Sequence, residues 1–268
     1  MGEKLSIVMV NKENSSPAVL AEKITAMREG GRIMGNLLRD LKNYVQPGMT
    51  GKEVDAWVRK EIEKRGAKVA YDMLEEEFPG AICISVNDQL VHGAPSDEIL
   101  EVGDKVSFDL VIQYKNYFTD AAFTMLVGGT GSPAVKKMIS VTESSLWEGI
   151  EQVKPGAKIG DIGHAVEKVL KKGHLGVIEN YIGHGIDKEM HQAPEVPNYG
   201  RKGTGYKLVE GDTICIEPMS CLGKPANYVD KDDGWSVKMK DGSIGCHVEH
   251  TILVTADGYE VLTLPDPE

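Results

Sequence analysis

The sequence predicts an α+β fold with pseudo-two-fold symmetry, in which each half contributes two helices and then antiparallel strands. Two observations carry this prediction. Segments of the first half recur in the second half at a constant offset of 108 residues (153 − 45), and both copies change from helical spacing of apolar residues to strand alternation. Two copies are too few for a solenoid, since repeat arrays usually need three or more units. We therefore expect a single domain over residues 1–268, with halves at about 17–127 and 134–268.

Each half opens with a predicted helix pair. Apolar residues recur at helical spacing over residues 20–41 and 54–62 of the first half, and over residues 135–150 and 159–170 of the second. A Thr-x-x-Glu sequence at residues 50–53 has the spacing of a capping box, in which two side chains satisfy free backbone N–H groups at a helix start.

The repeat continues from the helices into the strands. Val45–Gly48 (Val-Gln-Pro-Gly) matches Val153–Gly156 (Val-Lys-Pro-Gly). At the same offset, Gly103–Asp109 (Gly-Asp-Lys-Val-Ser-Phe-Asp) matches Gly211–Glu217 (Gly-Asp-Thr-Ile-Cys-Ile-Glu), with apolar residues on apolar residues and a carboxylate on a carboxylate. A constant offset over a helix and a strand makes chance an improbable explanation.

The composition excludes several classes of protein. Asp and Glu outnumber Lys and Arg by 41 to 30, and no basic stripe is present, so nucleic acid is not expected as the primary ligand. The early apolar stretch Leu5–Val10 is too short for a signal-peptide core or a membrane span, which predicts a cytoplasmic protein without membrane contact. The four cysteines form no Cys-x-x-Cys pair and are expected as reduced thiols.

Acidic residues occupy strand positions at which they are rarely found. Asp109 and Asp120 flank a predicted turn at 115–116, so we expect a hairpin to bring them across from each other, and a second hairpin to join Glu217 and Glu249. An unpaired buried carboxylate is costly, so four of them indicate a cation. The alternative is that each acid lies on the solvated face of a half-covered sheet.

His184 is the candidate imidazole ligand. It lies between Gly183 and Gly185, whose lack of a side chain allows close approach of the backbone. Carboxylates alone suit Mg²⁺ or Ca²⁺, whereas an added imidazole favours Mn, Fe, Co or Zn. A histidine between glycines can also be a turn residue.

Five stretches together carry a resemblance to a known family. They are Cys83–Gly93 with its Val91-His92-Gly93 end, Asp109 to Asp120, Gly183-His184-Gly185-Ile186, Ile216-Glu217-Pro218-Met219, and Val248-Glu249-His250-Thr251-Ile252. On these residues, and on Trp235, the chain from about residue 17 resembles the type I methionine aminopeptidases of the pita-bread metallopeptidase superfamily. The resemblance implies a pita-bread fold, in which a curved antiparallel sheet carries two helix pairs on its convex face.

The resemblance also implies a dinuclear metal site. Asp120 and Glu249 match ligands that bridge two divalent ions, Asp109 matches a ligand of one ion, and His184 and Glu217 match ligands of the other. The ions are expected to be Co, Mn, Fe, Zn or Ni, and the sequence does not choose among them.

Further residues match functional positions around this site. His92, His191 and Glu217 match catalytic residues, and both histidines also match substrate contacts. Candidate walls of a methionine pocket are Tyr71, Phe78, Cys83, Met190 and Trp235. The loop before Cys83 is longer than usual in the family, and its acidic run Glu75–Glu77 is expected to be solvated. The remaining histidines match no functional position and are interpreted as structural or solvent-facing; they are His164, His174, His247 and His250.

The implied reaction is removal of the initiator methionine from nascent polypeptides whose second residue is small, through a metal-bridged hydroxide. The expected partners are nascent N-termini, with contact at the ribosome left open, and a monomer without an N-terminal zinc-binding extension is expected. Two alternatives remain: a prolidase or proline aminopeptidase of the same fold, and a metal-free pita-bread binding module. The 33 residues from His184 to Glu217 leave no room for the insertion of a type II enzyme.

Overall fold

The computed structural model describes residues 16–74 and 78–267 and confirms the predicted α+β architecture. Leu5–Val10 and Glu75–Glu77 lie outside these ranges. No helix in the described part of the chain is long and apolar enough to cross a membrane. The helices are α1 (Pro17–Tyr44), α2 (Gly51–Lys64), α3 (Pro133–Ile150) and α4 (Ile159–Lys172), with the short 3-10 helices η1 (Tyr71–Met73) and η2 (Val127–Gly129).

An antiparallel sheet connects the two halves of the chain. Its strands follow the order β1 (Lys68–Val69), β4 (Lys105–Tyr114), β5 (Tyr117–Leu126), β14 (Glu249–Val254), β9 (Thr213–Ile216), β7 (Gly183–Gly185) and β8 (Gln192–Val196), with β2 (Cys83–Val86) paired to β4 and β15 (Tyr259–Val261) paired to β14. The halves meet where β5 pairs with β14. Two smaller sheets are β13 (Gly245–His247), β10 (Met219–Cys221) and β6 (Gly176–Val177), and β11 (Asn227–Val229), β12 (Val237–Met239) and β3 (Gln89–Val91).

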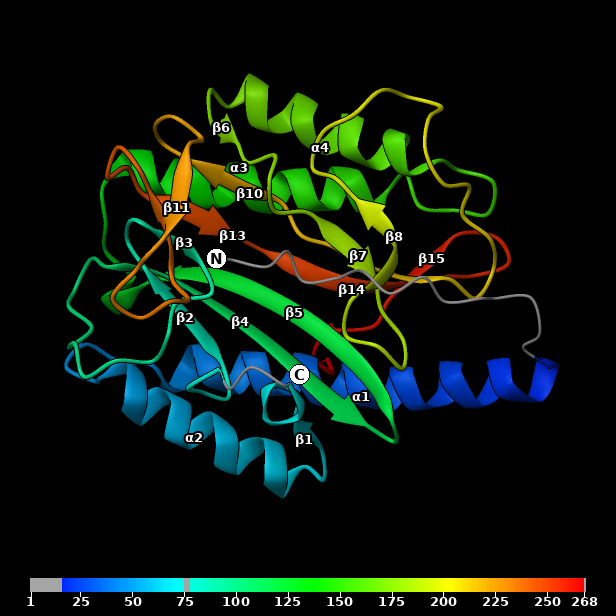
Figure 1. Ribbon diagram of the computed structural model, residues 1–268, viewed down its shortest axis with the longest axis horizontal. Helices are drawn as coiled ribbons and strands as arrows, with labels where there is room; N and C mark the ends of the chain where they lie inside the picture. Colours follow the sequence, from blue (N-terminus) through cyan, green and yellow to red (C-terminus); the bar gives the residue numbers. More distant parts are fainter. Residues whose placement is uncertain (1–15, 75–77, 268) are drawn as a thin grey trace.

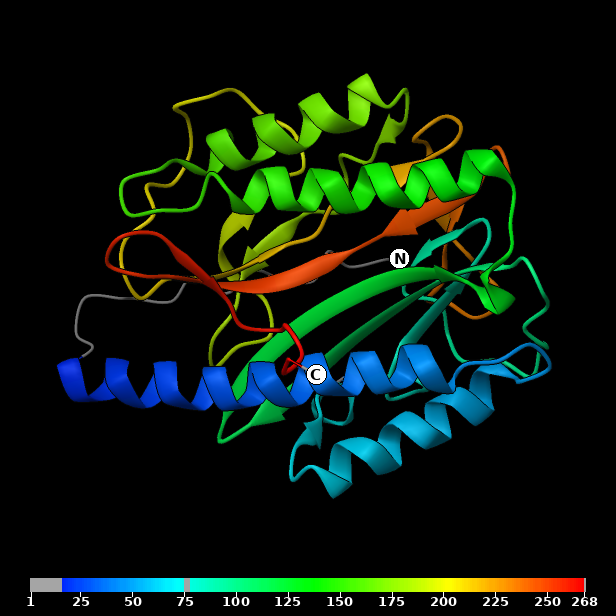
Figure 2. The same ribbon diagram turned by 180° about the vertical axis from the view of Figure 1, so that it is seen from behind.

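Both helix pairs cover the same face of the sheet. In Figure 1 the strands β4 and β5 pass in front of α1 and β14 lies between α1 and α3, and Figure 2 shows both helices in front when the molecule is seen from behind. Each pair packs on its own half of the core, because separate apolar clusters form under α1–α2 and under α3–α4. No α-helix of residues 16–74 and 78–267 covers the opposite face of the sheet.

The helix starts follow from the residues that cap them. The predicted capping box of α2 is confirmed: the Thr50 backbone N–H donates to Glu53 Oε2 at 2.8 Å, and the Glu53 backbone N–H donates to Thr50 Oγ1 at 3.2 Å. Helices α1 and α3 each begin with a Ser-Pro pair, in which the serine caps the helix and the proline occupies the first turn.

The β4–β5 hairpin is confirmed, but its register differs from the sequence prediction. Lys115 and Asn116 form the tight turn with positive φ angles of 49° and 67°. Asp109 pairs with Ala122, and Asp120 pairs with Val111, so the two acids are diagonal neighbours and not directly opposite each other. Their side chains still share one face, because residues directly opposite each other point to the same side of the sheet and Asp120 lies two residues from Ala122, the partner of Asp109.

The predicted second hairpin is wrong. Strands β9 and β14 do pair, from His250 opposite Ile216 to Leu253 opposite Thr213, and this register brings Glu217 to Glu249. The chain between them, however, forms β10, β11, β12 and β13 of the smaller sheets. The pairing is therefore long-range, which a local turn signal cannot reveal.

Candidate metal centre and substrate pocket

Four carboxylates converge on the helix-free side of the sheet. Asp109 lies on β4, Asp120 on β5, Glu249 on β14, and Glu217 directly after β9. Their exposed fractions are only 9%, 4%, 2% and 8%, respectively. Four buried acids of one sign in one place carry a high desolvation cost unless a cation compensates it.

His184 completes this cluster from β7. Its Nε2 lies 3.8 Å from Asp120 Oδ2 and 3.5 Å from Glu217 Oε1. Its Nδ1 lies 3.0 Å from the Gly185 carbonyl oxygen, so an Nδ1–H donor here leaves Nε2 as the free lone pair, the arrangement that metal-binding histidines use. A Cβ on Gly185 would lie 2.3 Å from the Ala193 carbonyl oxygen, which explains why glycine is needed beside this histidine.

The electrostatics of the cluster reflect its burial. Burial raises the pKa of Asp109, and it raises the pKa of Asp120, Glu217 and Glu249 well above their ordinary values, with repulsion from neighbouring carboxylates adding to the effect. Burial lowers the pKa of His184 to about 4, which favours the neutral imidazole that a metal ion requires. A cation would offset the repulsion among the carboxylates and could bind the neutral imidazole through its lone pair.

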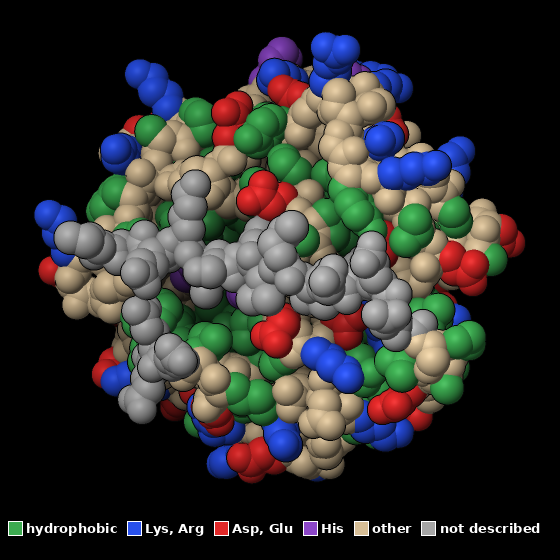
Figure 3. Space-filling view, turned by 45° about the vertical axis from the view of Figure 1, so that its right-hand side comes forward, with side chains coloured by type: hydrophobic (Ala, Val, Ile, Leu, Met, Phe, Trp, Pro, Cys, Tyr) green, Lys and Arg blue, Asp and Glu red, His purple; other side chains and the backbone are tan. Residues whose placement is uncertain are grey.

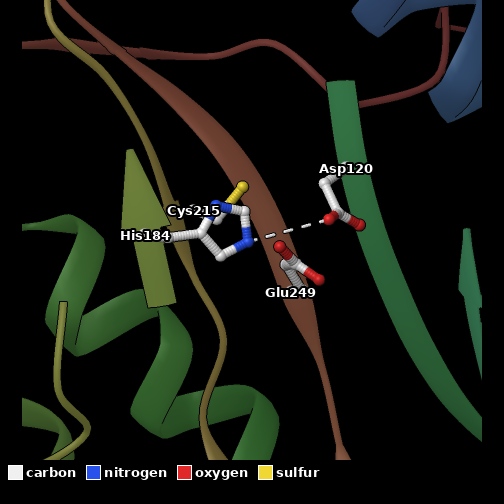
Figure 4. Close-up of side chains that lie close together, drawn as sticks. All are labelled: Asp120, His184, Cys215 and Glu249. Atoms are coloured by element: carbon white, nitrogen blue, oxygen red, sulfur yellow. Dashed lines mark ion pairs between the residues drawn. The ribbon is translucent and has the colours of Figure 1, made fainter. Parts of the chain in front are cut away.

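Polar atoms without partners show that the donor set fits a metal ion. Asp120 Oδ1 and Glu249 Oε1 are buried and make no hydrogen bond within the described residues. Asp120, His184, Cys215 and Glu249 place one potential ligand atom each within 4.8 Å of one another, and Figure 4 shows these side chains pointing toward one another from β5, β7, β9 and β14. Oxygen and imidazole donors of this kind suit borderline divalent metals. The four cysteines of the chain, including Cys215, are free and buried.

His247 requires a correction of the sequence interpretation. It matched no functional position and was expected to be structural or solvent-facing, yet it is 1% exposed and lies inside the carboxylate cluster. Its Nε2 is 3.4 Å from Glu217 Oε2 and 3.8 Å from Glu249 Oε2, and its Nδ1 is 3.9 Å from Asp109 Oδ2. The side chain reaches the site because His247 and Glu249, two residues apart, point to the same side of the chain.

An apolar pocket adjoins the carboxylates. All five side chains that the sequence suggested as pocket walls line it, together with Leu74 and Val111, which sequence reasoning missed. The Tyr71 ring lies 4.9 Å from Phe78, and the Trp235 ring meets Phe78 edge-on at 5.4 Å. The Tyr71 hydroxyl lies 3.4 Å from Cys83 Sγ, so its polar end is occupied within the wall. Figure 3 shows hydrophobic and histidine side chains in a recess on this side of the molecule.

His92 and His191 line the same pocket as the carboxylates. The His191 ring is 4.4 Å from the His184 ring, and the His92 ring meets Tyr181 edge-on at 5.7 Å. Burial lowers the pKa of His92 to about 4 and the pKa of His191 well below its ordinary value. Both therefore present neutral imidazoles to whatever enters the pocket.

Hydrogen bonds between Gly93 and β2 hold the neighbouring His92 in place. His92 has a positive φ of 57°, which is rare for a residue with a side chain and needs support from its surroundings. The following Gly93 donates its N–H to Ser85 Oγ at 3.0 Å and accepts from the Ile84 N–H at 2.8 Å. A Cβ on Gly93 would lie 2.2 Å from the Ile84 carbonyl oxygen, so only glycine fits beside His92.

This fold and site define a metallopeptidase of one family: the chain belongs to metallopeptidase family M24, whose family model matches residues 25–256. Among the relatives of this chain are methionine aminopeptidases. The chain is 37% identical over 238 residues to methionine aminopeptidase 1 of Bacillus subtilis, covering 88% of this chain and 94% of that protein. The crystal structure of methionine aminopeptidase from Rickettsia prowazekii superimposes with a TM-score of 0.88 at 34% identity, covering 97% of this chain and all of the other.

More distant structures share the fold alone. The prolidase from Pyrococcus furiosus matches with a TM-score of 0.71 and 24% identity, over 92% of this chain but only 65% of the prolidase chain. The pita-bread architecture that the sequence resemblance implied is thus confirmed, and the specific likeness is to the methionine aminopeptidases.

Proposed function

We propose that this protein is a metal-dependent aminopeptidase that removes N-terminal methionine from polypeptides. One observation carries the proposal: a buried cluster of four carboxylates and His184 lies at the end of an apolar pocket lined by aromatic and sulfur-bearing side chains. The likeness to methionine aminopeptidases over most of both chains supports the same activity.

The proposed metal ligands are Asp109, Asp120, His184, Glu217 and Glu249, holding two divalent ions with Asp120 and Glu249 shared. The unpartnered oxygens of Asp120 and Glu249 support shared roles, because each carboxylate has capacity left for a second ion. Divalent ions held there would lower the pKa of a bound water molecule and polarise the scissile carbonyl. Co, Mn, Fe, Zn or Ni would fit this donor set.

Glu217, His191 and His92 are proposed to have separate roles in the reaction. Glu217 is proposed to take a proton from the attacking water and to deliver it to the leaving amine. His191, next to His184, would donate to the oxyanion that develops on the scissile carbonyl, and His92 would orient the substrate from the pocket side. Both roles place a hydrogen-bonding group within a buried site, where such bonds are strongest.

The pocket suits a methionine side chain. Tyr71, Phe78 and Trp235 supply aromatic faces and edges for contact with a thioether, and Cys83 and Met190 add polarisable sulfur. Because norleucine replaces the thioether sulfur with a methylene of similar size, the pocket should also accept it. Exclusion of a bulky second residue rests on steric clash, and Gly, Ala, Ser and Thr are the proposed residues at that position.

The physiological substrate is proposed to be the initiator methionine of new polypeptides. A cytoplasmic location, a monomeric state and any contact with the ribosome stay predictions. The rival prolidase function is less well supported, since the prolidase likeness extends to the fold only. The rival metal-free binding module is disfavoured by the donor set, because unpartnered buried carboxylates are costly without a ligand.

The test compares two peptides with and without metal. The metal-stripped protein is reloaded with Co²⁺ or Mn²⁺ and supplied with Met-Ala-Ser or Ala-Pro-Ser, and the free amino acid is measured. We expect release of methionine only, and only with metal. Release of alanine from Ala-Pro-Ser in preference to methionine would favour the prolidase-like alternative.

A further inference from the structure

We propose that His247 is a further metal ligand, which binds through Nε2 an ion shared with Glu217 and Glu249. The inference rests on the proposed metalloenzyme function and adds a second imidazole to its site. Neither the sequence pattern nor the resemblance assigned His247 a role.

Two groupings of ligand atoms divide the site. Asp120, His184, Cys215 and Glu249 form one, and Glu217, His247 and Glu249 form the other, with all ligand atoms of each group within 4.8 Å of one another. The shared member is Glu249. The geometry thus describes two neighbouring positions for ions, one beside His184 and one beside His247, with Glu249 at both and Glu217 in reach of both through its two oxygens.

The distances at His247 suit ligands of one ion. Oxygen and nitrogen ligands lie about 2.0–2.2 Å from a divalent transition metal, so two ligands on the same ion are about 3–3.5 Å apart. His247 Nε2 is 3.4 Å from Glu217 Oε2 and 3.8 Å from Glu249 Oε2, longer than a good hydrogen bond but close to this spacing. Glu217 presents its other oxygen, Oε1, to His184 Nε2 at 3.5 Å.

The His247 imidazole has no hydrogen-bond partner within the described residues. Both ring nitrogens of His247 are buried and make no hydrogen bond there. Buried polar atoms are rarely left without partners, and each such atom calls for a water, an ion or a functional reason. His250 offers the contrast: its Nδ1 lies 2.8 Å from Thr263 Oγ1, on the other side of the same stretch of chain.

The backbone fixes the ring in this position. The Thr124 hydroxyl on β5 binds both backbone groups of His247. It donates to the His247 carbonyl oxygen at 2.6 Å and accepts from the His247 N–H at 3.4 Å. Met219, two residues after Glu217, pairs with His247 across β10 and β13. A ligand held by its backbone needs little reordering to bind an ion.

A second imidazole changes which metal the site prefers. An ion held by carboxylates alone favours hard cations such as Mg²⁺, whereas an imidazole at each position favours Co, Ni, Zn or Fe at both. We therefore expect the full protein to bind two equivalents of Co²⁺ in preference to Mg²⁺.

The test measures metal binding directly, with His247→Gln against the matched control His250→Gln. Metal-stripped protein is titrated with Co²⁺ and followed by calorimetry and by the visible absorption of the bound ion. His247→Gln should weaken one of the two sites at least about tenfold, the loss that even an outer partner of a ligand can cause, and should alter its absorption band. His250→Gln should titrate like the unmodified protein. Unchanged affinity and spectrum in His247→Gln would overturn the proposal.

A second measurement needs no variant. Nitrogen couplings to bound Mn²⁺, measured by pulsed electron paramagnetic resonance on the unmodified protein labelled with ¹⁵N-histidine, should reveal two ligating imidazoles at full loading. A single coupled imidazole, together with metal-dependent release of methionine, would refute the role of His247 and leave the proposed function standing. Failure of the unmodified protein to bind any divalent ion would overturn both.

Discussion

Lys105 allows a quantitative prediction about stability. It is the first residue of β4 and is fully buried, and its Nζ donates to the Ser85 and Gln89 carbonyl oxygens at 3.0 and 2.9 Å and to Ser107 Oγ at 3.5 Å. All three acceptors are neutral. Through the first two, the ammonium links β2 to β3, the strand that leads to His92.

Burial lowers the pKa of Lys105 from 10.5 to about 8. Because the folded-state pKa lies below that of the unfolded chain, the unfolded state binds more protons between pH 8 and 10.5, and stability rises with pH in this window. At 1.36 kcal/mol per pKa unit, the full change amounts to about 3 kcal/mol. Below pH 8 the full free-energy cost of burying the ammonium lowers the stability of the protein. Above pH 10.5 the amine is neutral in both the folded and the unfolded state, so this cost is absent.

The assay compares Lys105→Met with the unmodified protein by urea unfolding between pH 7.5 and 10.5, with metal removed. Relative to the variant, the unmodified protein should gain about 3 kcal/mol over this range. Other titrating groups are present in both proteins and cancel in the difference. The control is Lys60→Met, at an exposed residue of α2. Its free energy of unfolding, plotted against pH, should run parallel to that of the unmodified protein. Parallel curves for Lys105→Met as well would refute the reasoning.

Three further predictions concern the site. Asp120→Asn removes one proposed bridge and should lower both metal content and turnover, whereas full metal content with normal turnover would disprove the bridging role. His92→Ala should retain metal but lose about 10²–10⁴-fold in kcat; loss of the metal instead would identify His92 as a ligand. Gly93→Ala places a Cβ 2.2 Å from the Ile84 carbonyl oxygen, so the backbone beside His92 must shift and kcat should fall with metal content unchanged. Normal kcat in Gly93→Ala would show that the position of His92 is uncritical.

The helices and the first hairpin could be predicted from the sequence because their signals are local. The Thr50–Glu53 capping box and the turn at Lys115–Asn116 each involve residues a few positions apart. The pairing of β9 with β14 is different, because more than thirty residues separate Glu217 from Glu249 and fold into other sheets. Nothing in the local pattern distinguishes this arrangement from a hairpin.

The residues that sequence reasoning missed at the site share one signal. Val111, Cys215 and His247 each lie two residues from a proposed ligand on an extended segment, and strand side chains two apart point to the same face. Counting two residues from each ligand already identified would have predicted that these three residues also lie in the site. Leu74 carries no such signal, since it follows the 3-10 helix η1 and reaches the pocket through tertiary packing.

The most direct test of the proposed function is a steady-state comparison of Met-Ala-Ser with Met-Lys-Ser using the metal-loaded protein. A methionine aminopeptidase that excludes bulky second residues by steric clash should cleave Met-Ala-Ser with a kcat/KM at least about a hundredfold higher, a difference of about 2.7 kcal/mol in transition-state binding. Equal kcat/KM values for the two peptides would contradict methionine excision and identify a broad aminopeptidase instead.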